Sequence, residues 1–476
     1  MALKNEKESL QGIPQKNDCV PVTIEDIGAE GEGIGRYQGF TLFVKDAVVG
    51  DELIVRVLKT KKSYGYAKIE SIVKSSTFRV EPKCTLASRC GGCQIQQLDY
   101  QKQLEYKQNK VKNCIERIGG IKDYEMEPIV GMEDPYYYRN KSQYPVGKNQ
   151  NQDVVIGFYA GRTHSIIDTK HCFIGDKSNE LIVDTIRSFI KESNIAIYNE
   201  ELHTGLLRHI LIRVGFTTKQ VMVCLVINGK KIPKQELLLN KLLALNSIQH
   251  DFVIESICLN VNQEKTNVIL GDQVIPLYNE PTIVDQIGDI KYQISPLSFY
   301  QVNPVQTKKL YELALSYADL HGEEIVWDLY CGIGTISLFL AQKAKKVYGV
   351  EIIPQAIEDA KRNASLNQIT NAEFFVGAAE DVLPQKYKES KGAMSADVIV
   401  VDPPRKGCEE SLLETVVAMH PRRVVYVSCD PATLARDVKY LSEKGYQLKK
   451  VRPVDQFPHS THVETVVLLS QQKADE

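Results

Sequence analysis

The sequence predicts an α/β protein of several domains, with a small β-barrel first, a central α+β domain next, and an open parallel sheet at the C-terminus. Three observations support this prediction. The chain has 476 residues, too many for one typical core. Short strand-like runs separated by glycines fill the region before about residue 75. From about Ile294 onward, strand-like and helix-like runs alternate, which is typical of a parallel sheet.

Composition narrows the class of protein. The chain is 43% hydrophobic and 25% charged, as in ordinary globular proteins. Its net charge is −2, so the protein as a whole is not basic, and any surface that binds nucleic acid must be a local basic patch. Eleven cysteines, an odd number in a long chain, do not resemble a secreted disulfide framework. No apolar run is long enough for a membrane span, and the polar first 18 residues are no signal peptide. We expect a cytoplasmic protein, and no feature indicates an obligate protein partner.

The N-terminal region is expected to be a disordered tail over residues 1–18 and a β-barrel over residues 19–76. Between Val55 and Arg79 there are five lysines and two arginines but only one acid, Glu70. Tyr64 and Tyr66 lie among these charges, a pattern that suits phosphate contacts and base stacking. An ordinary solvent-exposed face without an RNA ligand explains this cluster of charged residues equally well.

The central region, residues 77–293, carries a cysteine motif but no catalytic signature. Cys84, Cys90 and Cys93 have the spacing of thiolate ligands, and Cys172 is a candidate for a fourth ligand. Spacing alone leaves zinc and an iron–sulfur cluster both open. A helix is expected over 99–118, and the run 205–214 alternates apolar residues with Arg208, His209 and Arg213, which could present a basic face for RNA binding.

The C-terminal region, residues 294–476, is expected to begin with a helix over 307–320 and to form a parallel sheet. The predicted strands are Glu324–Leu329, Lys346–Val350, Asp397–Val401, Arg423–Val427 and a final Val463–Leu469 that closes the sheet. Ligands of open α/β sheets bind at the carboxyl ends of the strands. The residues that follow each strand are therefore the first candidates for a functional site.

Three of these strand ends suit a nucleoside cofactor. The first strand runs into a loop with Gly332 and Gly334, where backbone can approach a ligand closely. A dinucleotide fingerprint would have glycine or alanine where Ser337 stands, which favours a nucleoside without a pyrophosphate. Glu351 follows the second strand, where a carboxylate can accept hydrogen bonds from ribose hydroxyls. Asp402 begins an Asp-Pro-Pro-Arg run of the kind that adenine-acting methyltransferases also have, so the run indicates methyl transfer without naming the target atom.

The remaining strand end offers a nucleophile. Cys429 follows the strand at 423–427; a lone cysteine is more often a buried structural residue, but here three other strands also end in binding-type residues. Carbon 5 of uracil becomes nucleophilic only after something adds to carbon 6, and a thiolate is well suited to this addition. A base must then remove the proton from carbon 5. Glu464, a solitary carboxylate at the start of a strand of valines and leucines, is the candidate base.

These residues match a known family. From about Val20 to its C-terminus the chain resembles bacterial RNA uracil-C5 methyltransferases, and most closely their 23S-rRNA branch. The motifs that carry the resemblance are the cofactor loop, the Asp-Pro-Pro-Arg run and the two signatures at 428–437 and 455–464. The resemblance implies a Rossmann-like, S-adenosylmethionine-dependent methyltransferase domain with Cys429 as nucleophile and Glu464 as base. It also implies cofactor contacts at Gln301, Tyr330, Glu351 and Asp402.

The resemblance implies further features. The barrel corresponds to a TRAM domain, an RNA-binding barrel of OB type, and the target uridine, expected in 23S rRNA, should be flipped out of its RNA. The family's rRNA branch favours a [4Fe-4S] cluster on Cys84, Cys90, Cys93 and Cys172, whereas its tRNA branch typically lacks both the barrel and the cysteines. Two alternatives stay open: a tRNA uracil-C5 methyltransferase, and a non-catalytic RNA-binding iron–sulfur protein with a relic cofactor fold. The intact Cys429, Glu464 and glycine loop argue against a relic.

Overall fold

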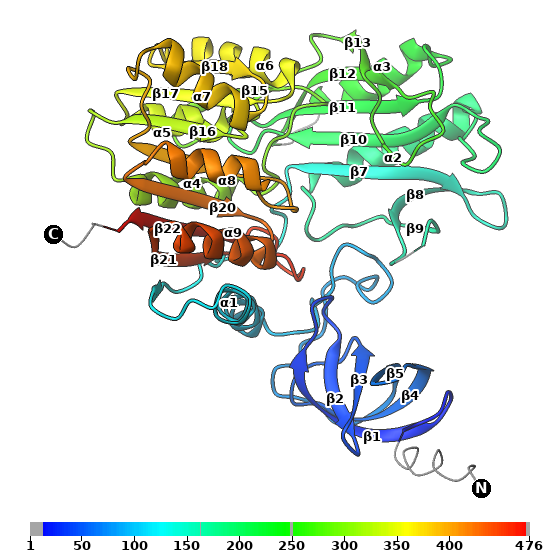
Figure 1. The fold of residues 1–476 in the computed structure, drawn as a ribbon. Helices are drawn as coiled ribbons and strands as arrows, with labels where there is room; N and C mark the ends of the chain where they lie inside the picture. Colours follow the sequence, from blue (N-terminus) through cyan, green and yellow to red (C-terminus); the bar gives the residue numbers. More distant parts are fainter. Residues whose placement is uncertain (1–12, 162, 248–250, 473–476) are drawn as a thin grey trace, which may run out of the picture. The chain divides into compact units, whose positions relative to one another are not determined.

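The computed structural model describes residues 13–161, 163–247 and 251–472. The chain forms two compact units (Figure 1). The first comprises the chain up to Lys107 with two short segments, Ala160–Arg162 and Phe457–Thr461. The second comprises Gln108–Tyr159, Thr163–Gln456 and His462–Glu476. It therefore includes both the central and the C-terminal sheets, which the sequence predicted as separate domains.

The first unit contains the expected barrel, closed in the order β1-β2-β3-β5-β4. Its strands are β1 (Cys19–Ile27), β2 (Gly33–Tyr37), β3 (Phe40–Lys45), β4 (Glu52–Thr60) and β5 (Tyr64–Lys74). Alternate side chains such as Val22, Leu42 and Val55 form its core. The sequence did not predict β2, because this strand is rich in glycine. Gly35 is needed there, since a Cβ atom at this position would lie 2.2 Å from Val22 Cγ1.

The predicted N-terminal tail is only partly within the described residues. Its first 12 residues lie outside them. Residues 13–18, by contrast, lie against the barrel: the Asn17 amide donates to Val57 O at 2.8 Å, and Thr60 Oγ1 donates to Pro14 O at 3.0 Å. Residues 13–18 of the predicted tail therefore contact the barrel strand β4, while the predicted disorder of the tail stays a prediction.

The predicted helix in the region after the barrel is confirmed as α1 (Tyr100–Arg117). Asp99 accepts hydrogen bonds from the amides of Gln101 at 3.0 Å and Lys102 at 3.3 Å, which satisfies the free donors of the first turn. The helix starts in the first unit and continues into the second.

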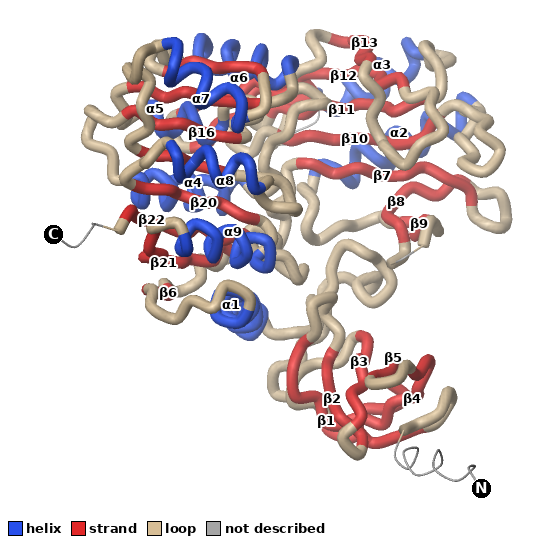
Figure 2. The backbone as a smooth tube through the Cα atoms, viewed as in Figure 1, coloured by secondary structure: helices blue, strands red, loops and turns tan. Residues whose placement is uncertain are grey.

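The central sheet has the order β13-β12-β11-β10-β7-β8-β9. Its strands and the nearby elements are β7 (Lys141–Lys148), β8 (Val154–Tyr159), β9 (Ile166–Asp168), β10 (Leu207–Val214), β11 (Gln220–Ile227), β12 (Val253–Val261), β13 (Gln273–Tyr278), α2 (Ser178–Ser193), α3 (Gln235–Leu243) and the short helix Ala244–Ser247. Helices α2 and α3 cover one face of this sheet (Figure 2). Arg208 and Arg213 on β10 are only 4% and 2% exposed, so the predicted solvent-facing basic surface is wrong for these two residues.

The C-terminal sheet has the order β18-β17-β16-β19-β20-β22-β21-β6, with the hairpin β14–β15 beside it. The elements are β6 (Glu125–Met126), β14 (Ile283–Ile287), β15 (Ile290–Ile294), α4 (Pro304–Ala318), β16 (Ile325–Leu329), α5 (Thr335–Ala341), β17 (Lys346–Glu351), α6 (Pro354–Leu366), β18 (Ala372–Val376), α7 (Ala379–Glu389), β19 (Val398–Val401), α8 (Glu410–Ala418), β20 (Arg423–Ser428), α9 (Pro431–Glu443), β21 (Tyr446–Val454) and β22 (Glu464–Gln471). The structure confirms the predicted α/β fold and its strands. It adds β6, β18 and β21 to the predicted strands, and the final predicted strand, β22, lies between β20 and β21.

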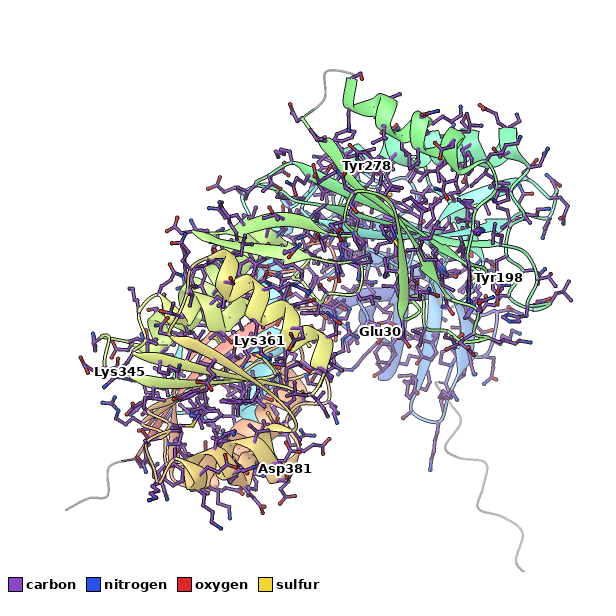
Figure 3. All side chains as sticks on the ribbon, turned by 90° about the horizontal axis from the view of Figure 1, so that it is seen from above. Glu30, Tyr198, Tyr278, Lys345, Lys361 and Asp381 are labelled. Carbon is purple, nitrogen blue, oxygen red and sulfur yellow. The ribbon has the colours of Figure 1, made fainter. Side chains whose placement is uncertain are left out.

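Both faces of the C-terminal sheet are buried. In β16, Val326 packs into one apolar cluster, while Trp327 and Leu329 pack into the cluster on the opposite face. A parallel sheet covered on both faces needs nearly continuous apolar strands, as in the Val-Ile-Val-Val of β19. Charged side chains such as Lys345, Lys361 and Asp381 project from the surface of this unit (Figure 3). Among the described residues, no helix is long and apolar enough to cross a membrane.

Candidate active site

Sheet topology brings the predicted site residues to one edge. Strands β16, β17, β19 and β20 run parallel, so their carboxyl ends share an edge, and β16 lies between β17 and β19 at the point where the strand order reverses. Such switch points are where open α/β sheets bind ligands. Strand β22 is antiparallel to β20, with Thr465 opposite Ser428. Glu464, the first residue of β22, therefore lies at the same edge as Cys429.

Cys429 occupies the junction between β20 and α9. The next residue, Asp430, caps the helix by accepting from the amides of Ala432 at 2.9 Å and Thr433 at 3.0 Å. Burial raises the pKa of the Cys429 thiol to about 12, and the carboxylates of Glu464 and Asp402 act in the same direction, while Arg405 opposes them. Without substrate the thiol is therefore protonated at neutral pH, and a nearby cation or base is needed to activate it.

Two carboxyl groups share the site with this thiol. Glu464 is only 3% exposed, and burial together with the charge of Asp402 raises its pKa to about 8. Burial also raises the pKa of Asp402 to about 7. Two neighbouring carboxyl groups do not readily ionise together, so Glu464 and Asp402 retain protons at neutral pH. A carboxyl with such a pKa can accept and release a proton in the physiological range.

The glycine loop after β16 lies against the end of β17. Tyr330 has a φ of 70°, and its amide donates to Val350 O at 3.0 Å. Glu351 accepts from the amides of Gly332 at 3.2 Å and Ile353 at 3.0 Å, and its oxygens have further lone pairs for ribose hydroxyls. A Cβ atom at Gly332 would meet no atom within 4 Å, so open space lies in front of this loop. Loop and carboxylate together suit a nucleoside.

A buried acid that the sequence did not single out supports the loop. Asp328 is 0% exposed, and burial raises its pKa to about 7. Ser337 donates to its Oδ2 at 2.5 Å. Among the described residues, Asp328 Oδ1 has no hydrogen-bond partner. Ser337 is the residue that argued against a dinucleotide fingerprint in the sequence. Its hydrogen bond to Asp328 joins the start of α5 to the end of β16, which gives this serine a structural role.

Gln301 is placed differently from the other three predicted cofactor residues. It is 7% exposed, and its backbone oxygen accepts from Asn140 Nδ2 at 2.9 Å. Its neighbour Asn303 caps α4 and donates to Gln456 O at 3.1 Å, which links this segment to the chain leading into Glu464. Within the described residues no hydrogen bond joins Gln301 to Tyr330, Glu351 or Asp402.

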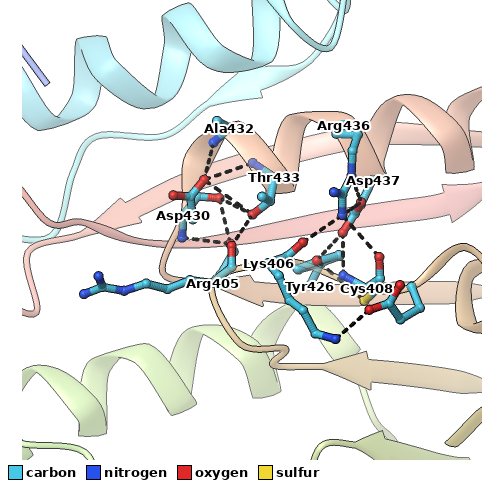
Figure 4. Close-up of polar contacts among 11 residues, drawn as sticks. Arg405, Lys406, Cys408, Tyr426, Asp430, Ala432, Thr433, Arg436 and Asp437 are labelled. Carbon is cyan, nitrogen blue, oxygen red and sulfur yellow. Dashed lines mark hydrogen bonds and ion pairs between the residues drawn. The ribbon is translucent and has the colours of Figure 1, made fainter. Parts of the chain in front are cut away.

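Asp437 on α9 connects the loop after β19 with β20 (Figure 4). It is 0% exposed and accepts from Tyr426 Oη at 2.6 Å and from the Cys408 amide at 2.8 Å. Arg436, beside it, donates to Lys406 O at 3.0 Å. This network fixes the loop that carries Asp402 and Arg405 relative to the strand that carries Cys429. A buried acid in an amphipathic helix was the available sequence signal, but the sequence did not reveal its partners.

The predicted cluster ligands fall in different units. Cys84, Cys90 and Cys93 belong to the first unit and Cys172 to the second. Among the described residues, no group of three or more histidine, cysteine, aspartate or glutamate side chains is placed to hold a metal ion. The iron–sulfur cluster therefore stays a prediction, and the cluster takes no part in the methyl-transfer steps described below.

Comparison with known proteins identifies the family. The sequence model named tRNA (uracil-5-)-methyltransferase matches residues 99–472, and the TRAM domain model matches residues 15–69. An uncharacterized RNA methyltransferase of Clostridium tetani is 50% identical over 96% of this chain and 97% of its own length. A similarly named protein of Halalkalibacterium halodurans is 49% identical over 96% of this chain and 98% of its own length.

Among solved structures, tRNA (uracil-54, C5)-methyltransferase of Pyrococcus abyssi, in complex with S-adenosyl-L-homocysteine, has a TM-score of 0.75 at 30% identity. The match covers 94% of this chain and 99% of that one. Fold, site and relatives together define an enzyme of the RNA methyltransferase class. More specifically, the chain belongs to the tRNA (uracil-5-)-methyltransferase family and carries a TRAM domain.

Proposed function

We propose that the protein uses S-adenosylmethionine to methylate carbon 5 of a uridine in RNA, in the cytoplasm, with Cys429 as nucleophile and Glu464 as base. The observation that carries the proposal is the antiparallel placement of β22, which puts Glu464 at the same sheet edge as Cys429. Thiol, carboxyl and an adjoining glycine loop are the groups that C5 methylation requires. A TRAM barrel in the same chain supports an RNA substrate.

The chain's residues divide the reaction between them. Cys429 Sγ forms a bond to carbon 6, which makes carbon 5 nucleophilic. S-adenosylmethionine, when bound, supplies an electrophilic methyl group. Glu464 then takes the proton from carbon 5; the electron pair re-forms the C5–C6 double bond, and the C6–S bond breaks to release the thiolate. Arg405, whose charge lowers the pKa of both Cys429 and Glu464, favours the ionised forms that these steps need.

The cofactor is assigned to the loop after β16. Tyr330 and Gly332 supply backbone close to the ligand, and Glu351 binds the ribose hydroxyls. The S-adenosyl-L-homocysteine bound to the Pyrococcus abyssi enzyme supports a cofactor of this kind. Gln301 and Asp402 are assigned to the methyl-donor side of the same site, on the strength of the family motifs that they belong to.

The expected RNA is 23S rRNA, because the chain's signatures resemble the rRNA branch of the family. A specific observation favours tRNA as the second candidate: the Pyrococcus abyssi tRNA enzyme matches 94% of this chain, a share too large to omit the barrel. The barrel alone therefore does not separate the two targets. Methylation of purified 23S rRNA and of a tRNA transcript, followed by mapping of 5-methyluridine, decides between them.

The mechanism is tested by trapping the covalent adduct. Glu464→Gln should still allow addition and methyl transfer, but the thiol cannot leave until the C5 proton has gone. A denaturing gel of this variant with RNA and S-adenosylmethionine should show a slow-migrating protein–RNA band. Glu464→Gln combined with Cys429→Ala should lose the band. A band that persists in the double variant would mean that another residue is the nucleophile, and normal turnover by Glu464→Gln would rule out Glu464 as the base.

We also propose that Cys84, Cys90, Cys93 and Cys172 bind a [4Fe-4S] cluster, on the basis of their thiolate spacing. Anaerobically purified protein should then be brown and contain about four irons per chain. Cys172→Ser should bleach the protein before it alters the methyl-transfer site, which is built from other strands. Colourless protein with a single zinc would contradict the iron–sulfur assignment.

A further inference from the structure

Three basic side chains gather near one end of the β7–β10 strand pair. Lys141 is the first residue of β7 and lies directly opposite Arg213 of β10, so both side chains share a face of the central sheet. Arg139 lies two residues before Lys141, close enough for its charge to lower the pKa of Lys141. Within the described residues, none of the three cations forms an ion pair with a carboxylate.

This arrangement is costly for the protein alone. Like charges placed opposite each other across a strand pair are destabilising. Arg213 is 2% exposed; its Nη2 donates to Pro296 O at 3.3 Å and to Ser298 O, while its buried Nε has no hydrogen-bond partner among the described residues. Burial, together with Arg213 and Arg139, lowers the pKa of Lys141 to about 7. A bound anion would pair these charges and restore the pKa of the lysine.

The cations lie beside the segment that leads to the active site. Asn140, between Arg139 and Lys141, donates from Nδ2 to Gln301 O at 2.9 Å and from its amide to Val302 O at 2.8 Å. Asn303 in turn donates to Gln456 O at 3.1 Å. On the face of the cations themselves, Arg213 donates to Ser298 O, three residues before Gln301. An anion held here would therefore lie near the segment that leads into the cofactor side of the site.

We propose that Arg139 and Lys141, with the charge of the buried Arg213 beside them, bind a phosphodiester group of the RNA substrate near the target uridine. The proposal rests on the proposed function, because it takes RNA as the ligand. Arginine binds phosphate through two parallel N–H groups, and lysine adds a compact charge. Phosphate contacts of this kind fix the register of a nucleic acid without reading its sequence. The site would thus hold the strand while a single base is turned into the pocket.

The test measures RNA binding at several salt concentrations, without S-adenosylmethionine. The double variant Arg139→Gln/Lys141→Met should bind RNA more weakly, with a slope of log affinity against log salt shallower by about 0.7–0.9 for each lost phosphate contact. Lys388→Met, which removes one charge from an exposed position on α7, should leave the slope unchanged. Arg213 is left intact because it also holds the carbonyls of Pro296 and Ser298.

Two further measurements exclude a purely structural role and a cofactor role. Without RNA, phosphate should raise the Tm of the wild type above its value in chloride at equal ionic strength, and should do so less in the double variant. In chloride the double variant should melt no lower than the wild type, because a repulsion has been removed. Affinity for S-adenosylmethionine, measured by calorimetry, should not change.

An unchanged salt slope, or a double variant that melts lower than the wild type in chloride, would overturn the inference. So would weakened cofactor binding with normal RNA binding, since the anion would then be the cofactor's carboxylate. Failure of the proposed function gives a different result: the wild type would form no 5-methyluridine in either RNA, while the RNA-binding slope would still be measurable.

Discussion

Replacing Glu464 by glutamine should change how the stability of the protein depends on pH. In the folded state burial raises the pKa of this carboxyl from 4.5 to about 8. Between these two values the folded protein keeps a proton that the unfolded chain has lost. The stability that this group contributes is therefore fully present below about pH 4.5, is lost as pH rises, and is constant again above about pH 8.

The size of the effect follows from the two pKa values. One pKa unit corresponds to about 1.4 kcal/mol, so the difference is worth about 5 kcal/mol, or about 3 kcal/mol if Asp402, which titrates in the same range, takes part of it. Relative to the wild type, Glu464→Gln should gain about 2–4 kcal/mol in free energy of unfolding between pH 5 and pH 9, because part of the difference is already present at pH 5. Glutamine occupies nearly the same volume but cannot lose a proton.

Urea denaturation of both proteins at intervals from pH 5 to pH 9 measures this difference. Glu414→Gln, at an exposed position on α8, is the matched control and should follow the wild type. The reasoning would be refuted if the free energies of unfolding of the wild type and of Glu464→Gln stayed parallel over the whole range. That result would mean that Glu464 is already ionised in the folded protein, so that burial does not raise its pKa.

Three further changes probe the parts of the site. Glu351→Ala should lower the affinity for S-adenosylmethionine about 10- to 100-fold, because a charge-assisted hydrogen bond contributes roughly 1.5–3 kcal/mol. An unchanged affinity, measured by calorimetry, would mean that the ribose of the cofactor binds at another residue. Gly407→Ala should lower the free energy of unfolding by about 1–3 kcal/mol, since Gly407 has a φ of 77° and a Cβ atom there would lie 2.6 Å from Asp437 Oδ2; a Tm equal to that of the wild type would show that the loop can adjust. Arg405→Gln should slow alkylation of Cys429 by iodoacetamide, because Arg405 lowers the pKa of this thiol; an equal rate would assign activation of the thiol to another group.

The sequence was sufficient for the fold class and for most of the chemical groups. Strand–helix alternation after Ile294 predicted the parallel sheet, and the residues after its strands, including Cys429 and Asp402, lie at the carboxyl edge of that sheet in the structure. These features are local, because a residue that ends a buried parallel strand must lie at the carboxyl edge wherever the strand is inserted. Strand β18 escaped prediction, since Ala-Glu-Phe-Phe-Val is short and half exposed.

Tertiary structure alone decided which of these groups meet. The sequence put Glu464 at the start of a final strand, but its proximity to Cys429 depends on β22 entering between β20 and β21 in the antiparallel sense. Strand order is set by packing over long separations in the chain, and periodicity contains no information about it. For the same reason the apparent basic face at Arg208 and Arg213 became buried: an alternating pattern gives two faces to a strand, and only the packed sheet determines what covers each of them.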